Sequence, residues 1–115
     1  MRKIERQMNM AITHKTDWSS SNTQVSFNSN TNCSQIYLHG HHIATYDHNL
    51  KAVKISSAGY ETRTTKSRLN ALLEEVKYGC KVFQKDWYWF VGYNDQTTLF
   101  RDGMILLDAD SLVTA

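Results

Sequence analysis

Basic and hydroxyl-bearing side chains gather at the start of the one convincing helical segment, residues 62–79. The group consists of Arg63, Thr64, Thr65, Lys66 and Arg68. A helix N-terminus carries partial positive charge and free backbone N–H groups, so it disfavours cations and favours anions. Cations and hydroxyls at that end are the donors that hold a phosphate. The pattern predicts an anion site here, with nucleic acid as its ligand.

The same charges have a simpler explanation, in which they are solvated or pair with carboxylates from other elements. Three and four residues after Lys66 and Arg68 the sequence has no acidic residue, so no helical neighbour neutralises them. A carboxylate from elsewhere in the chain, for example Asp86, Asp95 or Asp102, would have to approach them in the fold. The anion hypothesis fails if Lys66 and Arg68 are paired with internal carboxylates.

Histidines form a second group with possible chemistry. They are His39, His41, His42 and His48, with Asp47 beside them. Neutral imidazole and carboxylate are ligands for zinc or iron. However, adjacent residues of a strand point to opposite faces, and the sequence has no zincin or zinc-finger spacing. These histidines are therefore weak metal candidates, and a metal-dependent hydrolase is a distant third hypothesis.

A cluster of aromatic residues forms the third group. It consists of Trp87, Tyr88, Trp89, Phe90 and Tyr93. Rings on an exposed sheet face stack on bases, whereas rings in a small domain more often build the core. Core packing is the favoured interpretation for the run as a whole, with Tyr88 and Trp89 as the candidates for base stacking. Rings on both sides of the strand place it at the centre of a sheet, or covered on both faces.

Nucleophilic catalysis has no motif to support it. Cys80 or a serine with a histidine base would supply the residue types, but there is no Gly-x-Ser-x-Gly elbow, phosphate loop or paired-carboxylate motif. Cys33 and Cys80 lack metal-type spacing, and we expect both thiols to be free. The sequence therefore predicts a non-enzymatic protein without a cofactor.

The helical segment is recognised by its apolar period. Leu69, Leu72, Leu73 and Val76 recur at i, i+3, i+4 and i+7, which places them on one face. Thr64 or Thr65 would cap the first turn, and Gly79 suits the left-handed residue beyond the last. This apolar stripe requires a sheet to cover.

Alternating residues predict the strands of that sheet. The expected strands lie at 24–27, 36–38, 43–46, 51–57, 82–84, 87–91, 97–100 and 104–107. His39-Gly40 would turn one hairpin, and Arg101-Asp102-Gly103 would turn a final hairpin between the last two strands. We expect an α+β fold in which an antiparallel sheet of about six or seven strands, in the order β-β-β-β-α-β-β-β, carries one amphipathic helix across it.

Length and composition favour a single domain. The chain has 115 residues and a net charge of +2, which gives no strong overall field, so nucleic-acid affinity would need a local patch. We expect an N-terminal arm at 1–21, mobile or a short helix, with Trp18 docked on the domain, then the domain at 22–108 and a tail at 109–115. No apolar run of membrane-spanning length or secretory signal is present, so we expect a cytosolic protein without membrane partners.

Several short segments of the sequence resemble those of a family of small uncharacterised proteins of tailed bacteriophages, including cyanobacterial phages. They are Tyr37-Leu38-His39-Gly40, Ile43-Ala44, the run from Thr64 to Leu72, Val82-Phe83-Gln84-Lys85 with Trp89, and Asp102-Gly103-Met104. The resemblance covers residues 22–107. It implies a phage product acting in the cytoplasm of a bacterial host, and it transfers no catalytic residue.

Two functions remain in view. The first is nucleic-acid binding through the basic helix start. The second is a protein-binding module that modulates or inhibits a host bacterial enzyme, which suits a nearly neutral chain. Binding to a generic single-stranded or double-stranded nucleic acid, with an affinity that falls steeply as salt rises, would favour the first. A partner captured from nuclease-treated lysate would favour the second.

Overall fold

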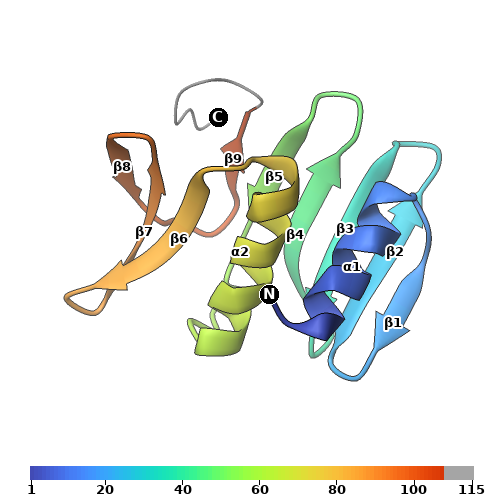
Figure 1. Cartoon of the computed structure of the whole chain (residues 1–115), viewed down its shortest axis with the longest axis horizontal. Helices are drawn as coiled ribbons and strands as arrows, with labels where there is room; N and C mark the ends of the chain where they lie inside the picture. Colours follow the sequence, from blue (N-terminus) through green and yellow to red (C-terminus); the bar gives the residue numbers. More distant parts are fainter. Residues whose placement is uncertain (108–115) are drawn as a thin grey trace.

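The computed structural model describes residues 1–107, which form two helices and nine strands (Figure 1). The elements are α1 Lys3–Thr13, β1 Trp18–Ser20, β2 Thr23–Asn28, β3 Cys33–Leu38, β4 His41–Asp47, β5 Ala52–Ile55, α2 Arg63–Val76, β6 Cys80–Lys85, β7 Tyr88–Tyr93, β8 Gln96–Leu99 and β9 Met104–Leu106. The predicted α+β class is confirmed, and so is the position of α2 between the two groups of strands. The predicted tail at 109–115 lies outside the described residues.

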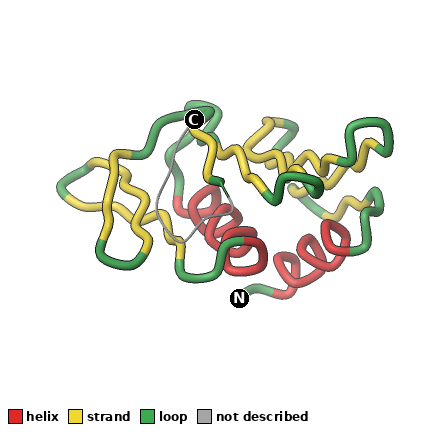
Figure 2. Tube along the Cα trace, turned by 90° about the horizontal axis from the view of Figure 1, so that it is seen from above, coloured by secondary structure: helices red, strands yellow, loops and turns green. Residues whose placement is uncertain are grey.

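The larger sheet has six strands in the order β1-β2-β3-β4-β5-β9, with every neighbouring pair antiparallel. Both helices lie on one side of it (Figure 2). Alternation along the strands directs one set of side chains toward the helices, and Val25, Ile36, Ala44 and Ile55 are all buried. The core therefore lies between this sheet and the helix layer.

The N-terminal arm is helical and belongs to this core. Met8 and Ile12, four residues apart on α1, are buried, as is Glu5. Trp18 begins β1 and packs half-buried against the core, as expected. The arm is thus the short helix that the sequence allowed, packed against α2 and β2.

Helix α2 buries the predicted leucine stripe but begins and ends differently. Leu69, Leu72 and Leu73 are buried. The N-cap is Thr62, whose Oγ1 accepts a hydrogen bond from the Thr65 amide at 3.1 Å, so the prediction of Thr64 or Thr65 as the cap was wrong. Either residue lies too far into the first turn to cap it. Gly79 does adopt a left-handed φ of +92°, three residues beyond the helix.

The smaller sheet is separate and has the order β6-β7-β8. The predicted central place of the aromatic strand is confirmed, since β7 pairs with both neighbours. The predicted final hairpin was wrong: β8 pairs with β7, whereas β9 joins β5 in the larger sheet. Asp102, which lies between β8 and β9, explains why the chain passes from the smaller sheet to the larger one. Its Oδ1 accepts hydrogen bonds from the Ser57 amide at 2.7 Å and from the Ser57 hydroxyl at 2.8 Å.

The turn predicted at His39-Gly40 joins β3 to β4, and both residues have positive φ. In residues 1–107 no helix is long and apolar enough to cross a membrane.

Candidate functional site

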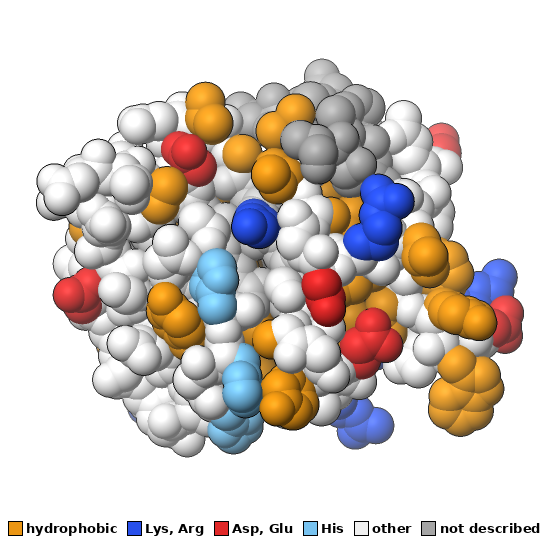
Figure 3. Space-filling model, turned by 180° about the vertical axis from the view of Figure 1, so that it is seen from behind, with side chains coloured by type: hydrophobic (Ala, Val, Ile, Leu, Met, Phe, Trp, Pro, Cys, Tyr) orange, Lys and Arg blue, Asp and Glu red, His pale blue; other side chains and the backbone are white. Residues whose placement is uncertain are grey.

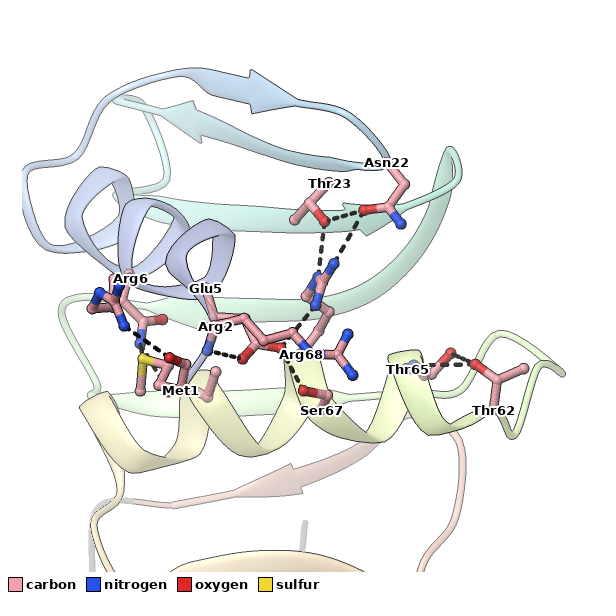
Figure 4. Close-up of polar contacts among 12 residues, drawn as sticks. Met1, Arg2, Glu5, Arg6, Asn22, Thr23, Thr62, Thr65, Ser67 and Arg68 are labelled. Carbon is pink, nitrogen blue, oxygen red and sulfur yellow. Dashed lines mark hydrogen bonds and ion pairs between the residues drawn. The ribbon is translucent and has the colours of Figure 1, made fainter.

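Arg68 is turned away from the predicted anion site. Its side chain is only 4% exposed, and the guanidinium lies between α2, α1 and β2 (Figure 4). Nη1 donates to Glu5 Oε2 at 2.8 Å, Nε donates to Thr23 Oγ1 at 2.9 Å, and Nη2 donates to Asn22 Oδ1 at 3.2 Å. Arg68 is therefore a core residue that pairs with an internal carboxylate, which removes it from the phosphate site.

Glu5 is held in its charged form by this network. Burial alone would raise the pKa of its carboxyl. Hydrogen bonds from Ser67 Oγ at 2.5 Å, from the Arg2 amide at 3.1 Å and from Arg68, with the positive charge of Arg68, outweigh burial and lower that pKa. The sequence interpretation allowed for a carboxylate from another element, with Asp86, Asp95 and Asp102 as examples, but it did not identify Glu5, which lies 63 residues before Arg68.

The start of α2 is already partly satisfied by its own side chains. Thr65 is buried, its amide is taken by Thr62 Oγ1, and the two hydroxyls lie 3.0 Å apart (Figure 4). The amide of Lys66 donates to the Thr62 carbonyl at 3.1 Å. Thr64 is half-buried and contributes to the wall of a neighbouring pocket. Of the predicted hydroxyl donors, Thr65 is thus committed to the cap.

Arg63 and Lys66 are the two predicted cations that remain near the surface. Arg63 is exposed and Lys66 is half-buried. Lys66 Nζ lies 5.9 Å from the ring centroid of Trp89 in β7. This cation–π contact brings the basic helix start next to the smaller sheet.

A pocket of about 340 Å³ opens beside the same helix start. It is lined by Leu38, His39, His41, Ile43, Ser57, Tyr60, Thr62, Thr64 and Thr65. The rings of His41 and Tyr60 stack there with centroids 4.5 Å apart. The pocket therefore has an aromatic wall and hydroxyls, but Arg63 and Lys66 are not among its lining residues.

The two residues proposed for base stacking face opposite ways. Trp89 is buried and meets Phe100 edge to face at 5.3 Å, so it belongs to the core and cannot stack on a base. Tyr88 is 64% exposed, and its neighbour Trp87 is 89% exposed at the β6–β7 turn. Asp86 and Trp87 both have positive φ, as a tight turn between paired Lys85 and Tyr88 requires.

The outer face of the smaller sheet collects aromatic and basic side chains. We call it the aromatic–lysine face, and it consists of Lys81, Phe83, Lys85, Trp87, Tyr88, Phe90 and Leu99. Phe83 stacks on Phe90 with centroids 5.7 Å apart. A Cβ at Gly92 would lie 3.1 Å from Phe83 Cε1, so glycine leaves room for that ring. Seen from behind, hydrophobic and charged side chains gather at this end of the molecule (Figure 3).

The smaller sheet turns its inner face toward α2, so within residues 1–107 the outer face points away from the core. Val82 and Val91 are buried toward α2, and α2 is the helix that packs on β6. Because neighbouring residues of a strand point oppositely, Phe83 and Phe90 point away from that contact. Among the elements of residues 1–107, α2 is the one that makes extensive contact with the smaller sheet, and it lies on the inner side.

The candidate metal ligands are dispersed. His42 Nε2 lies 2.8 Å from Thr45 Oγ1, His48 Nε2 lies 2.8 Å from Ser34 Oγ, and His41 stacks on Tyr60. Within the described part of the chain no three His, Cys, Asp or Glu residues approach as a ligand set. His39, His41, His42 and His48 therefore do not assemble the metal site that the hydrolase hypothesis needs.

Cys80 has little nucleophilic character. Burial raises the pKa of its thiol to about 11, so it is protonated at neutral pH. Cys33, half-buried, and Cys80 are both free thiols, as predicted.

Comparison with known proteins identifies the family. The model of a family described as "Kyanoviridae Gp96 protein" matches residues 1–107. The chain belongs to the Kyanoviridae Gp96 protein family. The resemblance to cyanophage proteins is thereby confirmed, and it extends through the N-terminal helix rather than starting at residue 22. No curated protein and no solved structure matches the chain.

Within this Kyanoviridae Gp96 chain, sequence reasoning missed most of the aromatic–lysine face. The signal was present as alternation: Lys81, Phe83 and Lys85 occupy every second position of β6. Pairing Lys85 with Tyr88 across the turn would have placed Tyr88 and Phe90 on that same face.

Proposed function

We propose that the protein is a non-enzymatic phage protein that binds single-stranded nucleic acid on the aromatic–lysine face. The observation that carries the proposal is a sheet face that, within residues 1–107, exposes rings and lysines side by side. Proteins that bind single strands without sequence preference combine stacking rings with a positive track for the backbone.

The rings provide the stacking part of the proposed interface. Trp87 and Tyr88 are the most exposed, and the half-buried Phe83 and Phe90 continue the surface inward. Each base stacked on such a ring is worth about 1 to 3 kcal/mol. This revises the sequence hypothesis, in which Tyr88 acted with Trp89.

The cations provide the phosphate part. Lys81 and Lys85 are exposed and lie on the same face as the rings. Lys66 lies over the buried ring of Trp89, on the inner side of the sheet, so it is not part of this group. Because the net charge is only +2, affinity depends on this local group rather than on the overall field.

The proposal is tested by the salt dependence of binding to a labelled oligothymidylate. Each phosphate contact on a single strand contributes about −0.7 to the slope of log K against log salt, so Lys81 and Lys85 predict a slope of about −1.4. The double variant Lys81→Ala/Lys85→Ala should reduce the magnitude of the slope by about 1.4.

A matched control is Lys3→Ala/Lys54→Ala, which removes the same charge from exposed positions outside β6–β8. It should leave the slope unchanged. Equal losses in both double variants, or no measurable binding at low salt, would contradict the proposal.

The alternative partner is a host bacterial protein. Exposed Trp87 and Tyr88 would also suit a protein interface, where such aromatics are enriched. A partner retained from nuclease-treated lysate and lost on Trp87→Ala would support that alternative. For a phage-family protein of either kind, we propose the host cytoplasm as the place of action.

A further inference from the structure

The two edge strands of the smaller sheet, β6 and β8, differ in what lies beside them. At the β6 edge, Asn70 Oδ1 accepts from the Val82 amide at 2.7 Å, and Asn70 Nδ2 donates to the Val82 carbonyl at 2.9 Å. This side chain satisfies both backbone groups of Val82, as a neighbouring strand would. At the other edge, β8 has no strand beside it among residues 1–107.

The backbone groups that β8 turns outward follow from its pairing with β7. The Phe100 amide donates to the Trp89 carbonyl at 2.9 Å, and Val91 pairs with Thr98. In an antiparallel ladder the hydrogen-bonded pairs alternate, so Thr97 and Leu99 direct their N–H and C=O groups away from β7. Both residues are exposed, Leu99 by 49%.

Within residues 1–107, β8 has no charge, proline or bulge to protect its outer edge. Its sequence is Gln-Thr-Thr-Leu. The edges of the larger sheet, β1 and β9, are each only three residues long. β8 is therefore suited to receive another strand.

The flanking charges of β8 suit a second copy of the chain. Two β8 strands can pair only if the outward N–H and C=O groups of one copy face those of the other. Thr97 can therefore lie opposite Leu99 of the other copy, which places Thr98 on the two-fold axis. In that register Asp95 lies opposite Arg101 of the other copy, at both ends. The alternatives, with Thr97 or Leu99 opposite itself, do not oppose these charges.

We propose that β8 pairs antiparallel with β8 of a second copy, which makes a symmetric homodimer with one continuous six-stranded small sheet. The aromatic–lysine faces of the two copies then lie on one surface. The dimer does not depend on the proposed nucleic-acid binding and is tested without any nucleic acid.

The register is tested by cysteine cross-linking in a Cys33→Ser background. Thr98→Cys places the two thiols at the axis, in a pair without direct hydrogen bonds whose Cα atoms are about 4.5 Å apart, which permits a disulfide. Thr97→Cys is the matched control, because two strand positions separate it from its own copy and give a distance of about 8 Å. The proposal expects covalent dimer from Thr98→Cys and little from Thr97→Cys, and equal or no cross-linking would overturn it.

Sedimentation equilibrium tests the pairing without cysteines. Thr97→Pro removes an outward N–H from each copy and should raise the dimer dissociation constant at least about tenfold, whereas Thr97→Val keeps the N–H and should not. Asp95→Arg should weaken the dimer and Asp95→Arg/Arg101→Asp should restore it. Circular dichroism must show each variant folded. A chain that stays monomeric to about 1 mM, where the dimer free energy would be only about 4 kcal/mol, would overturn the proposal, and so would a dimer that ignores these changes.

Discussion

Arg68 on α2 donates from Nη1 to Oε2 of Glu5 on α1 at 2.8 Å, and both side chains are almost completely buried. This pair joins two helices that are far apart in sequence, and Thr23 binds the same guanidinium from β2. The cation that looked misplaced at a helix start is therefore the centre of a buried network.

Breaking this network should destabilise the fold strongly. Glu5→Leu leaves the Arg68 guanidinium buried without a counter-charge, and we expect a loss of about 3 to 5 kcal/mol in the free energy of unfolding measured with urea. The double variant Glu5→Leu/Arg68→Met should lose much less of the free energy of unfolding, because Arg68→Met removes the unpaired buried charge. Arg63→Met, at an exposed position of the same helix, is the control and should change stability by about 0.5 kcal/mol or less. A Glu5→Leu loss as small as the control would refute the role of the pair.

Acid should weaken the fold first through His48. Burial lowers the pKa of its imidazole from 6.5, with Lys15 adding to the decrease and Asp47 opposing it. The unfolded chain then binds the proton more readily than the folded chain. The contribution of neutral His48 to the free energy of unfolding is therefore fully present above pH 6.5 and is lost as the pH decreases from 6.5 toward the folded pKa. Urea titrations of the wild type and His48→Gln should differ in this window, with the variant nearly flat. Stability that rises on acidification would contradict the assignment.

Glu5 predicts a second loss at lower pH. Its folded pKa lies below 4.5, so its contribution is complete above that value and disappears as the pH falls through the folded pKa. In Glu5→Gln this acid phase should diminish while the His48 phase remains. An unchanged acid phase would mean that other carboxylates control it.

Asn70 should govern the order of the β6 edge. Asn70→Ala leaves the amide and carbonyl of buried Val82 without partners, and we expect a loss of about 2 to 4 kcal/mol. Hydrogen exchange at the Val82 amide should accelerate more than at Val91 on β7. Asn70→Asp keeps the acceptor for the amide and should retain part of that protection. Equal acceleration at both amides would indicate global unfolding instead.

Cys80 should be inert in the native protein. With a thiol pKa of about 11 and a buried side chain, it should resist iodoacetamide at pH 8 and react only in urea. Mass spectrometry of alkylated Cys33→Ser isolates this residue. Rapid native labelling would contradict its placement in the core.

Sequence reasoning found features with local causes and missed those that depend on tertiary partners. The leucine stripe and the His39-Gly40 turn follow from short-range spacing, and both are present in the fold. The fate of Arg68 depends on Glu5, which nothing near Arg68 in the sequence identifies. Likewise, the Asp102 contact with Ser57 separates β8 from β9, where turn chemistry alone favoured a hairpin.

The most direct test of the proposed interface is photo-cross-linking to a single-stranded oligonucleotide that contains 5-bromouridine, with the adducts mapped by mass spectrometry. The account predicts adducts on Trp87 or Tyr88, lost at 1 M salt, while exposed Tyr78 at the opposite end of β6 stays unmodified. Adducts confined to Tyr78 or to the His41–Tyr60 pocket, or no adduct at low salt, would contradict it.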